Sequence, residues 1–282
     1  MPFVPGLTGS EWTARARGLE LRFGDIVALA ASDFGIPRSG VTSLIGPNGS
    51  GKSTLLAAVA GLHRPTSGEI TVLGTTPIQA RSRVAFVPQR TNVNDALPVT
   101  VREVVAMGRY ASLGMVRRAG TRDHEAVAEA IALLDLTELS GRHVRELSGG
   151  QRQRVFVAQG LVQDRDVLLL DEPTTALDMV SARVIDEAIR VERASGRPVV
   201  VTTHDLEDAR KSDHVILLAG RVVAEGLADH VLTPEHLSEA YRFNVSEEAG
   251  QVHLDDAAHS PVPGRHLHVE PPRYEHPGSH DH

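Results

Sequence analysis

The sequence predicts an α/β protein built around an open sheet of mainly parallel strands, and four short, mostly apolar runs carry this prediction. They are Val41–Ile45, Val84–Val87, Val167–Leu170 and Val199–Thr203. Such short apolar runs are typical of strands that are buried on both faces of a parallel sheet. In open parallel sheets, ligands bind beyond the carboxyl ends of the strands. The residues that follow the four runs are therefore candidates for one shared site.

The first run leads into a phosphate-binding pattern. Gly, four residues and then Gly-Lys-Ser make a P-loop, matched here by Gly46, Pro47, Asn48, Gly49, Ser50, Gly51, Lys52, Ser53 and Thr54. Apolar residues 55–58 then begin a helix. Backbone amides of a glycine-rich loop and a helix N-terminus together attract anions. We therefore expect a bound nucleoside triphosphate, with Lys52 on its phosphates and the Ser53 hydroxyl on Mg²⁺.

The other three runs end in side chains suited to the same chemistry. Asp171 can hold Mg²⁺ through water, and Glu172 can accept a proton from an attacking water molecule. An acidic pair after a strand is also common in a solvated loop, so the pair alone leaves both readings open. Because Gln89 and His204 follow the remaining two runs, we expect all four side chains to meet the P-loop in one crevice.

A fifth pattern opens a helix in the second half of the chain. It reads Leu147, Ser148, Gly149, Gly150 and Gln151. Ser148 and Gln151 stand three residues apart, the spacing of a capping box at a helix N-terminus. Apolar residues 155, 158, 161 and 162 follow at helical spacing. Taken alone, this pattern is an ordinary helix start.

Together these motifs make residues 17–243 resemble the nucleotide-binding subunit of ABC transporters. The resemblance implies an α/β fold: a P-loop ATPase core with a mixed sheet, an antiparallel β subdomain and an inserted α-helical subdomain at about residues 98–160. It also implies that ATP and Mg²⁺ bind between two copies of the chain arranged head to tail. Ser148, Gly149, Gly150 and Gln151 would then face the triphosphate held on the P-loop of the second copy.

The same resemblance assigns a role to each residue after the strands. Glu172 would be the catalytic base, and His204 would contact the γ-phosphate. Gln89 would sense both Mg²⁺ and the membrane partner, while Asp171 and Ser53 hold the metal ion. Asp178 matches a loop that communicates between the two ATP sites.

Phe23 is the candidate for stacking on adenine, where the family often has tyrosine. However, Leu19, Leu21 and Phe23 alternate along the chain. That alternation fits a half-buried strand equally well, so packing in the core is the competing interpretation.

The remaining segments define the expected organisation. Residues 1–16 are predicted to be a loose leader, because prolines and glycines interrupt them, and residues 17–45 to supply strands. Thr100 and Glu103 form a second capping box, at the start of the helical insert. A membrane subunit is expected to dock in a groove near residues 89–110. Strands are expected again at 215–218 and 222–224, and a helix begins at Thr233-Pro234.

The last segment, residues 244–282, is predicted to be a disordered tail because it lacks apolar periodicity. It holds seven of the fourteen histidines: His253, His259, His266, His268, His276, His280 and His282. Such tracts can bind zinc, nickel or copper weakly. Alternatively, they are polar residues of a solvated tail.

Composition limits the cellular locations and the partners that the chain can have. Its 282 residues contain no apolar stretch long enough to span a bilayer, and its first residues do not resemble a secretory signal. It contains no cysteine, which agrees with a reducing compartment. A net charge of -7 provides no basic surface for nucleic acid. Together with the resemblance to a transporter subunit, these features lead us to expect a peripheral protein at the cytoplasmic face of the cell membrane.

The segment from Val87 to Tyr110 resembles the ATPases of bacterial zinc and manganese importers. The expected partners are a second copy of the chain, integral membrane permease subunits and, indirectly, an extracytoplasmic solute-binding protein. Two alternatives stay open. One is an importer of iron-siderophores or cobalamin, and the other is an ABC ATPase that does not transport, such as a cluster-assembly type.

Overall fold

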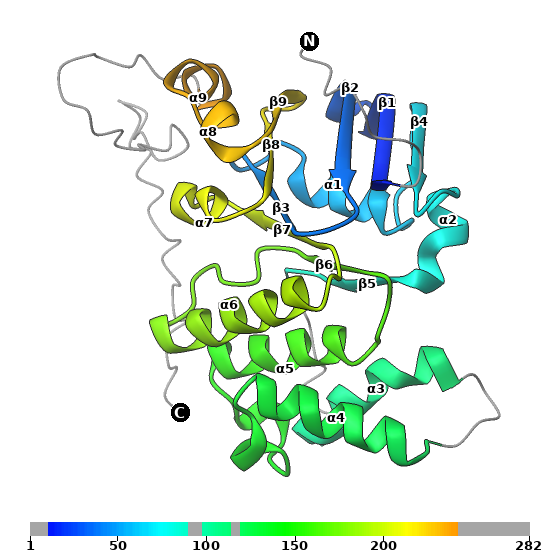
Figure 1. Ribbon diagram of the computed structural model, residues 1–282, viewed down its shortest axis with the longest axis vertical. Coiled ribbons are helices and arrows are strands. Elements are labelled where there is room, and N and C mark those ends of the chain that lie inside the picture. The colour runs from blue at the N-terminus through cyan, green and yellow to red at the C-terminus, as the bar shows by residue number, and fades with distance from the viewer. Residues whose placement is uncertain (1–10, 90–97, 114–118, 242–282) are drawn as a thin grey trace, which may run out of the picture. The chain divides into compact units, whose positions relative to one another are not determined.

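The computed structural model describes residues 11–89, 98–113 and 119–241, and two sheets organise them (Figure 1). The smaller sheet is antiparallel and has the strand order β2-β1-β4. Its strands are β1 Trp12–Phe23, β2 Ile26–Pro37 and β4 Ser67–Val72. The larger sheet has the order β5-β6-β7-β3-β8-β9. Its strands are β3 Val41–Ile45, β5 Val84–Val87, β6 Val167–Leu170, β7 Val199–Thr203, β8 His214–Leu218 and β9 Val222–Gly226.

The larger sheet is mixed because β9 alone runs antiparallel to its neighbour, whereas the other five strands are parallel. Strands β3, β6 and β7 are buried at every position, as expected of strands covered on both faces. The mixed α/β fold and the four strands predicted from apolar runs are confirmed. All four predicted strands end at the same edge, because they are parallel.

The helices fall between and around these strands. The α-helices are α1 Lys52–Val59, α2 Pro77–Ala80, α3 Val101–Leu113, α4 Thr121–Leu133, α5 Gly149–Leu161, α6 Met179–Ala194, α7 Leu206–Arg210, α8 Ala228–Val231 and α9 Pro234–Tyr241. Short 3-10 turns are η2 Arg81–Arg83, η3 Thr137–Leu139 and η4 Val144–Glu146. Helices α3, α4 and α5 pack on one another, on the side of the molecule away from the three-stranded sheet (Figure 1).

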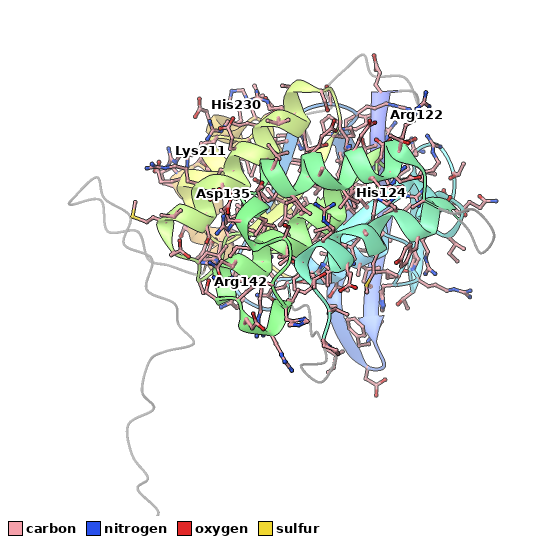
Figure 2. All side chains as sticks on the ribbon, turned by 90° about the horizontal axis from the view of Figure 1, so that it is seen from below. Arg122, His124, Asp135, Arg142, Lys211 and His230 are labelled. Carbon is pink, nitrogen blue, oxygen red and sulfur yellow. The ribbon has the colours of Figure 1, made fainter. Side chains whose placement is uncertain are left out.

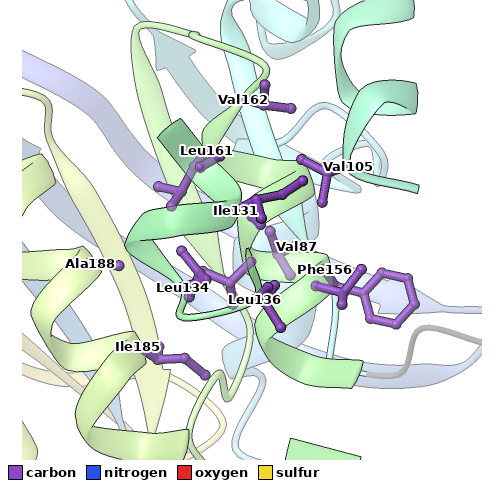
Figure 3. Packing of buried hydrophobic residues seen from close by; sticks show 14 of the residues in the cluster. Val87, Val105, Ile131, Leu134, Leu136, Phe156, Leu161, Val162, Ile185 and Ala188 are labelled. Carbon is purple, nitrogen blue, oxygen red and sulfur yellow. The ribbon is translucent and has the colours of Figure 1, made fainter. Parts of the chain in front are cut away.

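One apolar cluster joins this helical region to the sheet. It includes Val87 of β5, Ile131 of α4, Phe156 of α5 and Ile185 of α6, which are labelled in Figure 3. A second cluster fills the space between the two sheets and α1. Burial of such side chains contributes about 1.5–3 kcal/mol each. Helix α5 is therefore fixed both to its helical neighbours and to strands of the larger sheet.

The predicted helix starts are also found. Before α3, the backbone amide of Thr100 donates to Glu103 Oε2 at 2.7 Å, and the amide of Glu103 donates to Thr100 Oγ1 at 3.3 Å. Before α9, the amide of His236 donates to Thr233 Oγ1 at 3.3 Å. These bonds satisfy amides that a helix N-terminus leaves unpaired.

Strand β1 begins earlier than the sequence predicts. It starts at Trp12 and places Ala14 and Ala16 in the core, so residues 12–16 are not part of a loose leader. The alternation there is carried by alanine, which gives a weak hydrophobic signal, and the intervening arginines obscure it. The strand forms because β2 and β4 pair with it on both sides.

A buried ion pair ties the helical region together. Arg109 of α3 donates from Nη2 to Asp123 Oδ1 of α4 at 2.8 Å and from Nη1 to the carbonyl of Val162 at 3.0 Å. Val162 caps the C-terminus of α5. This contact links α3 to the first turn of α4 and to the C-terminus of α5, and removing one partner of a buried pair leaves an uncompensated charge.

The outside of the molecule is charged. Arg122, Lys211 and His230 are among the exposed side chains labelled in Figure 2. Within 11–89, 98–113 and 119–241, no helix combines the length and the apolar character that crossing a membrane requires. Three expected segments lie outside the described residues: the leader up to residue 10, residues 90–97 of the docking groove, and the histidine-containing tail.

Candidate functional site

The loop after β3 is shaped for close backbone approach. Gly46 has φ 156°, and a Cβ there would lie 2.0 Å from the carbonyl oxygen of Leu218. Gly51 has φ 98°, and its Cβ would lie 2.5 Å from the carbonyl oxygen of Ala28. Both contacts are far too short for any side chain. The loop therefore requires glycine at these two positions.

The other residues of the loop range from exposed to buried. Asn48, Gly49 and Ser53 are exposed, and Pro47 and Thr54 are half-buried. Ser50 Oγ is buried and has no hydrogen-bond partner among the described residues. An orphaned buried hydroxyl beside a glycine-rich loop fits a polar ligand that supplies the missing bond.

Lys52 is the first residue of α1, and its side chain is buried against the P-loop. Its side chain is 5% exposed, and Nζ donates to the carbonyls of Gly46 at 2.8 Å and Pro47 at 3.0 Å. Burial lowers the pKa of Lys52, while the nearby carboxylates of Glu172 and Asp171 act in the opposite direction. The ammonium group thus stands between the loop and the acidic pair, where an anionic phosphate would replace its carbonyl contacts.

One continuous chain of hydrogen bonds links Ser53, Asp171, Thr202, Glu172 and Gln89. The carboxylate oxygen Oδ1 of Asp171 accepts from Ser53 Oγ at 3.0 Å and from Thr202 Oγ1 at 2.7 Å. The backbone amide of Glu172 donates to Thr202 Oγ1 at 2.7 Å. Gln89 Nε2 donates to Glu172 Oε2 at 2.6 Å. The convergence of Gln89, Asp171 and the P-loop expected from the sequence is therefore present.

The backbone at Glu172 is strained. Its φ of 46° lies in the left-handed region, which costs a non-glycine residue about 1–3 kcal/mol. Pro173 follows directly and is buried. Such strain persists only where surrounding contacts fix it, and here the bond from the Glu172 amide to Thr202 is one of those contacts.

His204 follows β7 at the same edge of the sheet and is exposed. The amide of Asp205 donates to Thr203 Oγ1 at 3.0 Å, and Asp205 then caps α7. These bonds fix the backbone on both sides of His204 and leave its side chain at the surface.

The Leu147 to Gln151 pattern lies at the start of α5, away from α1 in the ribbon (Figure 1). The capping box is formed, with the Ser148 amide donating to Gln151 Oε1 at 3.0 Å and the Gln151 amide donating to Ser148 Oγ at 3.3 Å. The helix packs on α3, α4 and α6. Ser148 and Gly149 are exposed.

Asp178 caps α6 beside this helix start. Its carboxylate accepts from the Ser181 amide at 2.8 Å and from Ser181 Oγ at 2.9 Å. The donated backbone hydrogen bond of Ser181 is the main cause that lowers the pKa of Asp178. A Cβ at Gly150 would lie 2.6 Å from Asp178 Oδ2. The Asp178 loop thus contacts the buried side of the α5 start.

Phe23 ends β1 with 54% of its surface exposed, whereas Leu19 and Leu21 are fully buried. The core-packing interpretation is therefore wrong for Phe23. Its ring centroid lies 4.5 Å from that of His63, with the planes tilted by 42°. An exposed ring supported by a second ring offers a surface on which a planar base can stack.

Two residues of this region were not predicted as site residues. Thr202 carried a signal, because it is a polar residue near the end of an otherwise apolar strand. His63 carried none, since its contact with Phe23 depends on the pairing of distant segments.

The ligands suited to Mg²⁺ are present as oxygens of Ser53, Asp171 and Gln89, which are the hard donors that this ion prefers. Among the described residues, no group of three or more His, Cys, Asp or Glu side chains could hold a metal ion by itself. The donor set fits a metal that arrives with a phosphate ligand, which is how Mg²⁺ usually binds.

These features define a nucleotide-binding protein of the P-loop class, because a strand leads into a glycine-rich loop with a buried lysine and an acidic pair nearby. Comparison with known proteins then narrows the class. The family model described as ABC transporter matches residues 29–175. The zinc transport system ATP-binding protein TroB of Treponema pallidum (strain Nichols) is 39% identical over 241 residues, which are 85% of this chain and 91% of TroB.

Two further comparisons agree. The manganese transport system ATP-binding protein MntB of Listeria innocua is 35% identical over 226 residues, which are 80% of this chain and 94% of MntB. A solved dimeric structure of an ATP-binding cassette in a post-hydrolysis state, bound to ADP and Pi, is similar with a TM-score of 0.66 and 27% identity. The similarity covers 76% of this chain and 98% of that one. The chain belongs to the ABC transporter family, as an ATP-binding protein and an ATP-hydrolysing enzyme.

Proposed function

We propose that this chain is the ATPase subunit of an importer for zinc or manganese, bound at the cytoplasmic face of the membrane to permease subunits that receive metal from a solute-binding protein. The hydrogen-bonded chain from Ser53 to Gln89 is the observation that carries the ATPase part of the proposal. The metal cargo is supported by the relatives, which are named as zinc and manganese transport proteins.

Each residue of the site has a defined task in ATP hydrolysis. Lys52 exchanges its carbonyl partners for the β- and γ-phosphates, and Glu172 accepts a proton from the attacking water. Ser53, Asp171 and Gln89 hold Mg²⁺, which when bound neutralises charge on the phosphates. Gln89 would use its amide oxygen for Mg²⁺, which leaves Nε2 able to keep its hydrogen bond to Glu172.

The position of the Leu147 to Gln151 pattern supports a dimer. Ser148 and Gly149 are exposed and lie on a helix that packs away from α1, so a second copy is required to place them on a triphosphate. In a head-to-tail dimer, Ser148, Gly149, Gly150 and Gln151 of one copy close over the P-loop of the other. Asp178, which contacts the same helix start, then lies where the two sites communicate. His204 contacts the γ-phosphate.

The test is Glu172→Gln in the purified protein and in the native host. The substitution keeps the size of the side chain but removes the base, so we expect retained binding of MgATP and an ATP turnover reduced by more than about 100-fold. Static light scattering should show an ATP-dependent dimer that persists. Glu69→Gln, an exposed position on β4, is the matched control. Unchanged turnover in E172Q contradicts the assigned base.

The cargo is tested by total cell metal content, measured element by element. Selective loss of zinc or manganese in the E172Q host supports import of that metal. Accumulation means export, and unchanged metal content indicates an organic cargo or an ATPase that does not transport.

A further inference from the structure

Thr202 connects the two carboxylates of the site, although nothing in the chemistry of ATP hydrolysis requires it there. It is the fourth residue of β7, and β7 pairs with β6 so that Val201 lies opposite Leu170. The next residues along the two strands are Thr202 and Asp171. The register of the sheet therefore brings the threonine hydroxyl beside the acidic pair.

The direction of each hydrogen bond at Thr202 is fixed. The Glu172 amide can only donate, so Thr202 Oγ1 accepts that bond at 2.7 Å. Thr202 must then donate its own proton to Asp171 Oδ1, also at 2.7 Å. Thr202 is 1% exposed, so both bonds are shielded from solvent. One hydroxyl thus orients the side chain of Asp171 and the backbone of Glu172 together.

Both partners depend on this contact. Asp171 is 5% exposed, and its other donor, Ser53, is the residue proposed to turn to Mg²⁺. Thr202 is the donor that stays with Asp171 when Ser53 binds the metal. Glu172 has φ 46°, a backbone conformation that a fixed amide contact helps to maintain. Without the hydroxyl, the carboxylate of Asp171 gains rotational freedom and the backbone of Glu172 can relax.

We propose that Thr202 is a positioning residue, which sets the orientation of Asp171 toward Mg²⁺ and of Glu172 toward the attacking water. This inference rests on the proposed roles of Asp171 and Glu172. Valine at this position would continue the apolar pattern of Val199–Val201 and keep the branched shape. The hydroxyl, rather than the shape, is therefore what the site uses.

The experiment compares Thr202→Val and Thr202→Ser in the full-length chain. Loss of a hydrogen bond to a charged group should lower kcat of T202V about 10- to 100-fold. The Mg²⁺ concentration that half-saturates binding of a fluorescent ATP analogue should rise at least about fivefold. The KM for ATP and the affinity for the analogue in EDTA should change less than about twofold, because the P-loop is intact. T202S should restore kcat and the Mg²⁺ dependence.

Thr42→Val is the matched control, since it makes the same change at a buried position of the neighbouring strand β3. It should leave both readouts within about twofold of the parent chain. The proposal is overturned by a T202V protein with unchanged kcat and Mg²⁺ dependence, by a T202S protein as impaired as T202V, or by loss of the fold in T202V. Unchanged turnover in E172Q would contradict the base role of Glu172, on which this inference rests, whereas an inactive E172Q together with an unimpaired T202V would overturn only the role of Thr202.

Discussion

Phe23 and the P-loop act on different parts of the nucleotide, so their substitutions have separable effects. Phe23→Ala should raise the KM for ATP about tenfold, because stacking of a base on an aromatic ring contributes about 1–3 kcal/mol. Its kcat should stay within about twofold, since the phosphate contacts remain. Steady-state ATPase kinetics test this, with Phe23→Trp expected to retain the parent KM.

Ile26→Ala is the control for Phe23→Ala. Ile26 pairs with Phe23 across the β1–β2 hairpin and is 72% exposed, but it has no ring on which a base can stack. An equal rise in KM in both variants would assign the effect to the hairpin and not to stacking.

His214 links stability to pH. Burial lowers the pKa of His214 from 6.5 to about 4, and its Nδ1 is buried with no partner among the described residues. The unfolded chain therefore binds a proton more readily than the folded chain between these two values. The contribution of the neutral imidazole to stability is complete above pH 6.5 and is lost as the pH falls toward 4.

We expect His214 alone to lower the free energy of unfolding by about 2 kcal/mol between pH 7.5 and pH 5. Urea denaturation at both pH values measures this. His214→Leu should remove that part of the difference, while His230→Gln, at an exposed position, should not. A pH dependence identical in H214L and the parent chain would contradict the assignment.

At the scale of elements, substitutions of Gly149 and Gly150 in the Leu147 to Gln151 pattern should have different effects, one on the proposed dimer contact and the other on packing. A Cβ at Gly150 would lie 2.4 Å from Ser181 Oγ, whereas a Cβ at Gly149 meets nothing within 4 Å. Gly150→Ala should therefore destabilise the fold by about 1–3 kcal/mol, because overpacking displaces the start of α6. Thermal unfolding should show a Tm lower by about 2–4 °C for each kcal/mol.

Gly149→Ala should leave the Tm unchanged or slightly raised, because alanine favours a helix. Its ATPase rate should nevertheless fall, since the added methyl group lies on the surface proposed to meet the second copy. A G149A protein with the parent ATPase rate would argue against that surface as the dimer contact.

The elements show which parts of the fold local sequence determines. The strand before the P-loop and the capping boxes at Ser148 and Thr100 were predictable, because apolar runs and caps act within a few residues. The start of β1 was not, since Ala14 and Ala16 become strand residues only through pairing with β2 and β4. The order of strands in the larger sheet depends on contacts between distant segments and leaves no local signal.

The site residues also divide into those that a local motif predicts and those that only the fold brings together. The P-loop and the acidic pair have recognisable motifs, and the structure brings them together as predicted. Thr202 could be noticed as a polar residue near a strand end, but its two partners became known only from the β6–β7 register. The exposure of Phe23 also required the fold, because its alternation with Leu19 and Leu21 predicts burial.

At the scale of the whole molecule, the histidine-containing tail should be separable from catalysis. Deletion of residues 251–282 should leave ATPase kinetics and Tm unchanged, since every proposed site residue lies before it. Calorimetry should detect weak zinc binding by the full-length chain and its loss after the deletion. A full-length chain that binds no zinc would identify the tail as a linker, and reduced ATPase activity after deletion would show a regulatory contribution.

The central place of β3 in the larger sheet determines when the protein can first work during its synthesis. Both neighbours of β3, β7 and β8, are encoded more than 150 residues later. At about 5–20 residues per second, the ribosome takes roughly 10–30 s to deliver them. Until then the nascent chain carries an apolar strand and a P-loop without the two strands that pair with β3 on either side. The unfinished polypeptide therefore lacks Thr202 and His204, at the end of β7, and cannot yet form the complete site.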